Sequence, residues 1–118
     1  MKDDSIYLKH ILESIRRIEE NTRDGREIFL ARHTLQDAVL RNLQTLSEST
    51  QRISDSLKAM SPEIEWKRIT AFRNILVHDY LGIDMARIWE IAQRDIPEPK
   101  RVTMAMLRSV EEKPQGAL

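Results

Sequence analysis

Apolar residues recur at intervals of three and four positions along most of this 118-residue chain. Near the start the interval joins Leu8, Ile11, Ile15 and Ile18, which is the period of an α-helix. No stretch alternates apolar and polar residues with the period of two that a half-buried strand shows. Three glycines and four prolines are few for a sheet with many turns. The pattern therefore predicts an all-α protein, an antiparallel bundle of four main helices with shorter helical pieces.

Capping residues and breaks in the apolar spacing divide the chain into expected helices. Ser5 is expected to cap the first helix, and Gly25 closes the break that follows it. Ser61 with Pro62 should open a later helix, and Asp84 should cap the next one. Residues 1–111 are expected to form one domain and residues 112–118 a frayed C-terminal tail. The expected helical ranges are residues 5 to about 21, 26–32, about 34–57, 61 to about 80, 84 to about 95 and about 100–110.

The composition excludes several classes of function. Nineteen Lys and Arg balance nineteen Asp and Glu, so any contact with nucleic acid must be local and cannot rest on a broad positive surface. The absence of cysteine removes disulfides, thiolate nucleophiles and cysteine zinc sites. No apolar run is long enough to cross a bilayer, and the first residues lack the apolar core of a signal peptide. The expected location is therefore the cytoplasm.

Motifs for other common chemistries are missing as well. His10, His33 and His78 are the only histidines, and no two have the spacing of metal ligands on one helix, so no metal site is expected. There is no glycine-flanked serine nucleophile. Three glycines cannot build a glycine-rich phosphate loop. Kinase, dinucleotide and serine-hydrolase chemistry are therefore not expected.

The stretch 73–80 gathers the reactive side chains of the chain and reads Arg-Asn-Ile-Leu-Val-His-Asp-Tyr. Arg73 can hold a phosphate, and His78 can move a proton near neutral pH. Five residues on a smooth helix place these two positions roughly 140 degrees apart around the axis, whereas Asn74 and His78 share a face. Either the helix loosens near His78, or two copies of the chain pair and join their motifs in one cleft. Taken singly, such a histidine or arginine is more often a cap or a solvated surface group.

At these residues the chain resembles the HEPN superfamily, and within it the HepT-like toxins of prokaryotic toxin–antitoxin pairs. The hallmark of that family is Arg, four to six residues, His, one residue and Tyr, which corresponds here to Arg73, His78 and Tyr80. Trp66, the run from Gly82 to Trp89, and the stretches 37–39 and 41–43 also resemble the family, so the likeness covers residues 7–107. The chain departs from the family at residues 47–49, where Ser-Glu-Ser replaces a common Gly-Glu-Ala.

The resemblance implies an all-helical homodimer that acts as a metal-independent endoribonuclease, the toxin of a type II or type VII-like toxin–antitoxin system. Arg73 and His78 would be its catalytic pair, and Asn74 and Asp79 would be polar neighbours in the cleft. No cofactor is implied for the chain itself. The implied antitoxin is a minimal nucleotidyltransferase that uses ATP to add AMP to Tyr80, which would place negative charge where RNA must bind.

A second hypothesis keeps the dimer and the nucleotidyltransferase but removes the catalysis. In it, Arg73 and His78 only hold a nucleotide, and the chain is a non-catalytic nucleotide- or protein-binding subunit of a nucleotidyltransferase complex. Cleavage of RNA in the presence of a chelator separates the two hypotheses.

Overall fold

The computed structural model describes the backbone of residues 2–78 and 82–112, without the side chains of residues 2, 3, 73–78 and 112. Within these residues the chain is helical and contains no strand, so the predicted all-α class is confirmed. The proposed tail and the homodimer stay predictions. The elements are α1 (Lys2–Thr22), α2 (Arg26–Ala31), α3 (His33–Arg52), α4 (Asp55–Ala59), α5 (Trp66–His78), α6 (Met85–Glu90), the π-helical turn η1 (Ile91–Asp95) and α7 (Pro97–Glu112).

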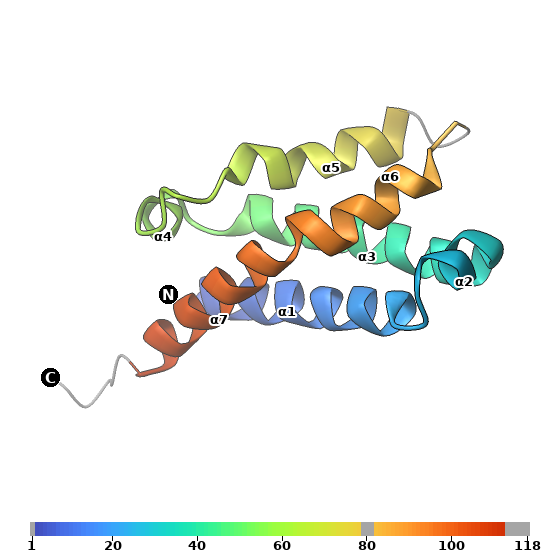
Figure 1. Ribbon diagram of the computed structural model, residues 1–118. Helices are drawn as coiled ribbons and strands as arrows, with labels where there is room; N and C mark the ends of the chain where they lie inside the picture. The colour runs from blue at the N-terminus through green and yellow to red at the C-terminus, as the bar shows by residue number, and fades with distance from the viewer. Residues whose placement is uncertain (1, 79–81, 113–118) are drawn as a thin grey trace, which may run out of the picture.

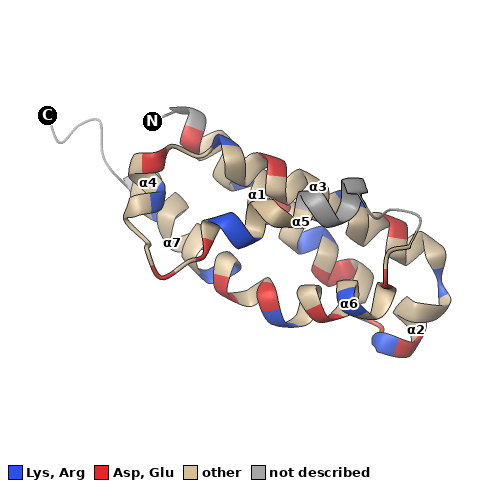
Figure 2. Cartoon of the chain, turned by 90° about the horizontal axis from the view of Figure 1, so that it is seen from above, with Lys and Arg blue, Asp and Glu red and all other residues tan. Residues whose placement is uncertain are grey.

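Four long helices form the antiparallel bundle (Figure 1). Helix α3 packs along α1, α5 packs on α3, and α7 packs on α1. Seen from above, α6, η1 and the start of α7 run past the side of α5 (Figure 2). Helices α1 and α3 are therefore the centre of the molecule, with α5 and α7 attached to them.

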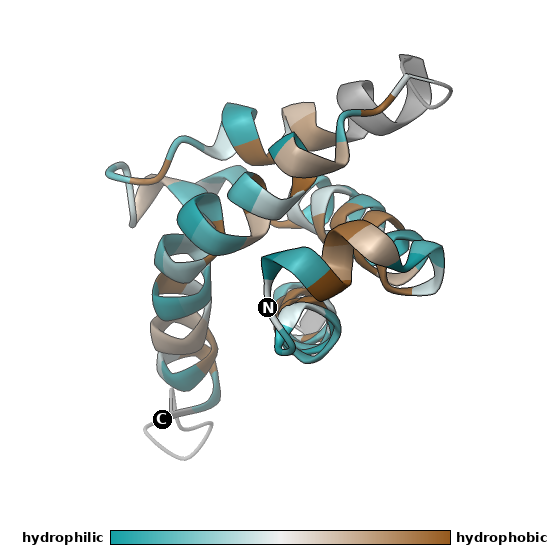
Figure 3. Cartoon of the chain, turned by 45° about the vertical axis from the view of Figure 1, so that its right-hand side comes forward, coloured by the Kyte–Doolittle hydropathy of each residue, from teal (hydrophilic) through white to brown (hydrophobic). Residues whose placement is uncertain are grey.

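The core lies between these helices, where the apolar faces meet and the hydrophilic faces point outward (Figure 3). The helical period explains this arrangement, because residues three and four apart lie on one side of a helix. The largest fully buried apolar side chains of the core are Leu8, Ile11, Ile15, Ile18, Phe29, Val39, Leu43, Leu46, Ile88 and Ile96.

The break between α1 and α2 lies where the sequence predicted it, but the predicted cap at the start of α1 is absent. Helix α1 begins at Lys2, so Ser5 is inside it and the predicted Ser5 cap is wrong. Gly25 has a φ of 102°, which side chains rarely adopt, and it turns the chain into α2. The Gln36 side-chain amide donates to Phe29 O at 3.0 Å and Leu30 O at 3.1 Å, which holds α2 against the start of α3.

The predicted single helix over residues 34–57 is wrong, because the chain breaks between α3 and α4. Ser54 caps α4, and its Oγ accepts from Leu57 N at 3.3 Å. The Asp4 carboxylate accepts from Ser54 N at 2.9 Å and from Ser54 Oγ at 2.7 Å. Asp4 is buried at the start of α1, so a contact between distant segments replaces helical hydrogen bonds at this break.

Helix α5 begins at Trp66, later than the predicted start at Ser61. Residues 61–65 form turns, in which Ile64 N donates to Ser61 O at 3.2 Å. The Trp66 indole Nε1 donates to Lys58 O at 3.1 Å and to Ser61 O at 3.2 Å. The indole thus ties this turn to the end of α4, and the helix starts only after it.

The C-terminal elements confirm one cap and correct one boundary. The Asp84 carboxylate accepts from Ala86 N at 2.9 Å, which confirms the predicted cap of α6. The α-helix then changes to the π-helical turn η1, which the sequence analysis did not predict. Pro97 opens α7 and does not lie in a break before it, since proline has no N–H to leave unpaired in a first turn.

Candidate functional site

Helix α5 carries the first part of the proposed motif on a continuous α-helix. It remains α-helical up to its last residue, His78, so the backbone positions of Arg73 and His78 lie about 140 degrees apart around the axis. The side chains of Arg73, Asn74 and His78 lie outside the described residues, and Asp79 and Tyr80 lie wholly outside them.

The neighbours of these positions on α5 show which faces of the helix they occupy. Lys67 and Ala71 are exposed, and the position of His78 lies within about 20 degrees of both, because they are eleven and seven residues earlier. The position of Arg73 lies within about 40 degrees of buried Ile69 and of half-buried Trp66. The two motif positions therefore belong to different faces: His78 to the outward stripe and Arg73 to the edge of the packed stripe.

A cleft separates the N-terminal half of α5 from η1 and the start of α7. It consists of two adjoining hollows of about 220 and 340 Å³ that share Arg68, Arg94 and Asp95 in their walls. Arg68 Nη2 donates to Asp95 Oδ1 at 2.8 Å across it. Apolar residues of the wall are Ile64, Ile69, Phe72, Ile91 and Pro99, and the other charged ones are Glu63, Glu65, Asp84, Arg87, Glu90 and Glu98.

Nothing in the sequence pointed to this cleft or to the pair that bridges it. Arg68 and Asp95 are separated by 27 positions, and neither belongs to a motif. The π-helical turn that carries Asp95 has no signature in the sequence, so no signal pointed to it. The charges around the cleft are mixed, with acids at least as numerous as arginines, so the cleft is not a general anion site.

The departure at residues 47–49 lies on α3, the helix that packs against both α1 and α5. Ser47 and Ser49 are buried, and the Ser47 hydroxyl donates to Gln44 O at 2.9 Å. Glu48 is half-buried, and its carboxylate accepts from Gln44 Nε2 at 3.4 Å. The hydroxyl groups at this position are therefore small enough for close helix packing, and that of Ser47 is satisfied by its own helix.

Two further features of the described residues bear on chemistry. Among them, no group of three or more histidine and acidic side chains is arranged to hold a metal ion. His10 and His33 are exposed, on α1 and at the start of α3. No helix within residues 2–78 and 82–112 is long and apolar enough to span a membrane.

Comparison with known families decides the relationship. A family described as "Ribonuclease HepT-like" matches residues 11–106, which include all of α5 and the cleft beside it. The chain belongs to the HepT-like ribonuclease family. The predicted resemblance is thereby confirmed.

Individual relatives agree with the family assignment. The chain is 38% identical to a protein of Thermococcus cleftensis named "Probable ribonuclease HepT", over 80% of this chain and 86% of the relative. It is 33% identical to a Methanocaldococcus jannaschii protein named "Putative RNase", over 85% of this chain and 93% of the relative. A second protein of that organism, "Gamma-glutamylcyclotransferase and putative RNase", is 36% identical over 93% of this chain, which spans only half of its length. No solved structure matches the chain.

Proposed function

We propose that this HepT-like protein is a cytoplasmic toxin that cleaves RNA without a metal ion, using Arg73 and His78. Membership of the HepT-like ribonuclease family is the observation that carries this proposal. The names of the relatives as ribonucleases support it. The Arg-x4-His stretch lies on one helix, and Lys67 and Ala71, on the stripe of α5 that includes the position of His78, are exposed.

The proposed reaction is attack by a ribose 2′-hydroxyl on the neighbouring phosphate. A base removes the hydroxyl proton, the oxygen forms a bond to phosphorus, and an acid protonates the departing 5′-oxygen. The products are a 2′,3′-cyclic phosphate and a free 5′-hydroxyl, and no metal or redox partner is needed. Imidazole suits both proton transfers near neutral pH, and the Arg73 guanidinium suits the charge that builds on the phosphate oxygens.

The helix geometry favours a site shared by two copies of the chain. One motif contains one histidine, whereas the reaction needs a base and an acid. Positions about 140 degrees apart on one α-helix cannot both face a single atom without help from a second surface. A symmetric pair built across the outward stripe of α5 would bring two histidines and two arginines together. Asn74 shares the His78 face, and Asp79 follows it in sequence, so both belong to the proposed cleft.

The deciding experiment is RNA cleavage by the purified chain in excess chelator. Arg73→Ala, Arg73→Lys and His78→Ala should each lower the rate by about a hundredfold or more, because a lysine cannot reproduce the planar fork on phosphate. Arg108→Ala, at an exposed position of α7, is the matched control and should cleave like the parent. A folded parent that binds nucleotide but cleaves no RNA would favour the non-catalytic binding subunit. Loss of activity in chelator would contradict the metal-free mechanism.

Mixing the two inactive variants tests the shared site. Copies with Arg73→Ala still provide His78, and copies with His78→Ala still provide Arg73. A mixed pair combines one histidine and one arginine, so one proton-transfer group and one phosphate-binding group return to the shared cleft. Activity should rise above that of either variant alone and stay below that of the parent, whose pair has two histidines. No recovery, together with a monomer in light scattering, would confine the site to one chain.

The proposed partner is a minimal nucleotidyltransferase that inactivates the toxin by modification. The Tyr80 phenol oxygen would attack the α-phosphate of ATP, so that AMP is transferred and pyrophosphate leaves. The added charge and adenine would then exclude RNA from the cleft by repulsion and bulk. Intact-mass spectrometry after incubation with the partner and ATP should show an AMP-sized increment that Tyr80→Phe lacks. An increment that persists in Tyr80→Phe would assign the modification to another residue.

A further inference from the structure

In its described part, helix α5 packs mainly against one other helix. Its extensive packing is against α3, and in its described part the buried side chains are Ile69 and Phe72. Arg68, Ile69 and Phe72 of α5 also line the cleft, and η1 lies across that cleft. Apolar contacts have no direction, so they restrain the rotation of a helix about its axis less than a directional bond does.

Arg68 and Asp95 bridge the cleft between α5 and η1. Arg68 Nη2 and Asp95 Oδ1 are 2.8 Å apart, and the Asp95 side chain is only 21% exposed. Among the side chains that the structure describes, this is the only ion pair that α5 makes. A charge-assisted hydrogen bond is directional, so it restrains the rotation that the apolar contacts leave free.

The position of Asp95 depends on an irregular turn. It is the last residue of the π-helical turn η1, between α6 and α7. A π turn holds an extra residue, and one residue corresponds to about 100 degrees of helical rotation, so the turn changes the side on which Asp95 emerges. In the structure Asp95 meets Arg68 of α5, which gives the irregular turn a physical role.

We infer that Arg68 and Asp95 are a positioning pair that sets the rotation of α5 and thereby the directions of the Arg73 and His78 positions. The inference rests on the proposed ribonuclease function, in which these two positions must meet one phosphate. Side chains reach about 5–6 Å from a helix axis, so a rotation of about ten degrees displaces their ends by about 1 Å. A displacement of that size can lower a reaction rate by about a hundredfold.

The pair contributes to position far more than to stability. The Arg68 side chain is 59% exposed, and ion pairs that water reaches add little to the free energy of unfolding. Removing the bridge should therefore leave the protein folded while α5 becomes free to rotate. If the ion pair only stabilised the fold, its removal would lower the activity and the free energy of unfolding together.

A double-mutant cycle in the full-length chain tests the inference. Arg68→Gln, Asp95→Asn and the double variant should each lower kcat for RNA cleavage about tenfold, with KM little changed. The double variant should lose no more than either single one, because the two residues act through one contact. Glu19→Gln is the matched control. It removes the 2.8 Å ion pair between Lys100 and Glu19, which joins α7 to α1 at comparable exposure.

Hydrogen exchange provides a readout that does not depend on catalysis. The backbone amides of α5 should exchange faster in all three variants, whereas those of α1 and α3 should not, and Glu19→Gln should leave α5 unchanged. If the losses in kcat of the two single variants multiplied to about a hundredfold in the double variant, the inference would be overturned. An equal loss of kcat in the Glu19→Gln control would overturn it too. Unchanged exchange in α5 would overturn it as well. A parent that cleaves no RNA would refute the proposed function, and the exchange measurement would still decide whether the pair holds α5.

Discussion

The α1–α3 hairpin and helix α5 are held together in very different ways. The hairpin packs along the full length of two long helices, and most of the fully buried side chains belong to it. Helix α5 packs on α3 of this hairpin, and its described part is also tied to the end of α4 by the Trp66 indole and to η1 by the Arg68–Asp95 bridge. Elements that carry function are commonly drawn from the less stable parts of a protein. Stability and the proposed chemistry therefore reside in different regions, and substitutions should separate them.

The largest expected effect is on the stability of the hairpin. Leu46 is fully buried in α3, so Leu46→Ala should lower the free energy of unfolding by about 2–5 kcal/mol through lost burial and the cavity left behind. Urea denaturation measures this change. Ile6→Ala, at a 51% exposed position of α1, is the control and should cost less than about 0.5 kcal/mol. If Ile69→Ala on α5 proved more costly than Leu46→Ala, the comparison between the two regions would be reversed.

A smaller effect is expected where the hairpin joins α4. Asp4→Ala removes the acceptor of the Ser54 N–H and hydroxyl, and leaving buried polar groups without partners costs about 1–3 kcal/mol. Thermal unfolding should show the loss, and faster amide exchange should appear around residues 53–57 and not in α5. Asp24→Ala, at an exposed position between α1 and α2, should change neither. Exchange that also rises in α5 would show that the two regions are coupled.

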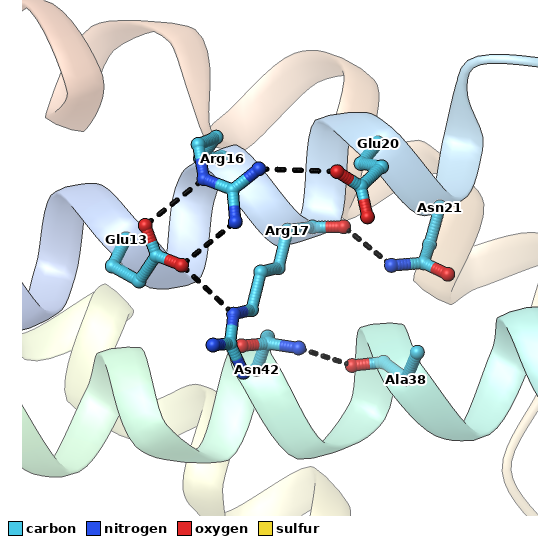
Figure 4. A network of polar contacts seen from close by, with 7 residues as sticks. All are labelled: Glu13, Arg16, Arg17, Glu20, Asn21, Ala38 and Asn42. Carbon is cyan, nitrogen blue, oxygen red and sulfur yellow. Dashed lines mark hydrogen bonds and ion pairs between the residues drawn. The ribbon is translucent and has the colours of Figure 1, made fainter.

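The smallest effect concerns the outer surface of α1, where Glu13 lies between two arginines (Figure 4). Hydrogen bonds from Arg16 and Arg17 lower the pKa of Glu13 from 4.5 to about 2. Because its pKa is lower in the folded chain, Glu13 contributes stability above its unfolded pKa, and this contribution is lost as pH falls from about 4.5 to about 2. Glu13→Gln should therefore slightly flatten the decline of Tm over that range.

The size of this surface effect also depends on salt. Glu13 is exposed, so added salt should weaken its attraction to the arginines and reduce the difference between Glu13→Gln and the parent. A carboxyl NMR titration that places the Glu13 pKa near that of an ordinary glutamate would contradict the hydrogen bonds. A difference in Tm that persists in high salt would exclude a surface ion pair as its cause.

The sequence predicted correctly those features of the fold that depend on residues close together in the chain. The apolar spacing located the four long helices, and Asp84 caps α6 as its side chain suggested. The errors lie where distant residues take over. Asp4, fifty residues away in the sequence, accepts a hydrogen bond from Ser54 N and ends α3 early. The Trp66 indole holds the turn after Ser61, although the Ser-Pro-Glu sequence there suits a helix start.

The candidate site also has a part that the sequence predicted and a part that it did not. The Arg-x4-His-x-Tyr spacing pointed to the family that the comparisons then confirmed, because those residues are adjacent in sequence. Arg68 and Asp95 could not be found this way, since only the π-helical turn brings them together. Roles of individual side chains in the motif stay predictions until the cleavage experiments are done.

The contact between Asp4 and Ser54 also has a consequence for the order of assembly. It joins positions fifty residues apart, and a chain is synthesised from its N-terminus. The first turn of α1 therefore finds its partner only once Ser54, just beyond α3, has been made, and the residues of α5 follow it in the chain. We expect that the surface that receives α5 can form before residues 73–80 leave the ribosome. Synthesis would then deliver the proposed toxin motif onto a preformed support.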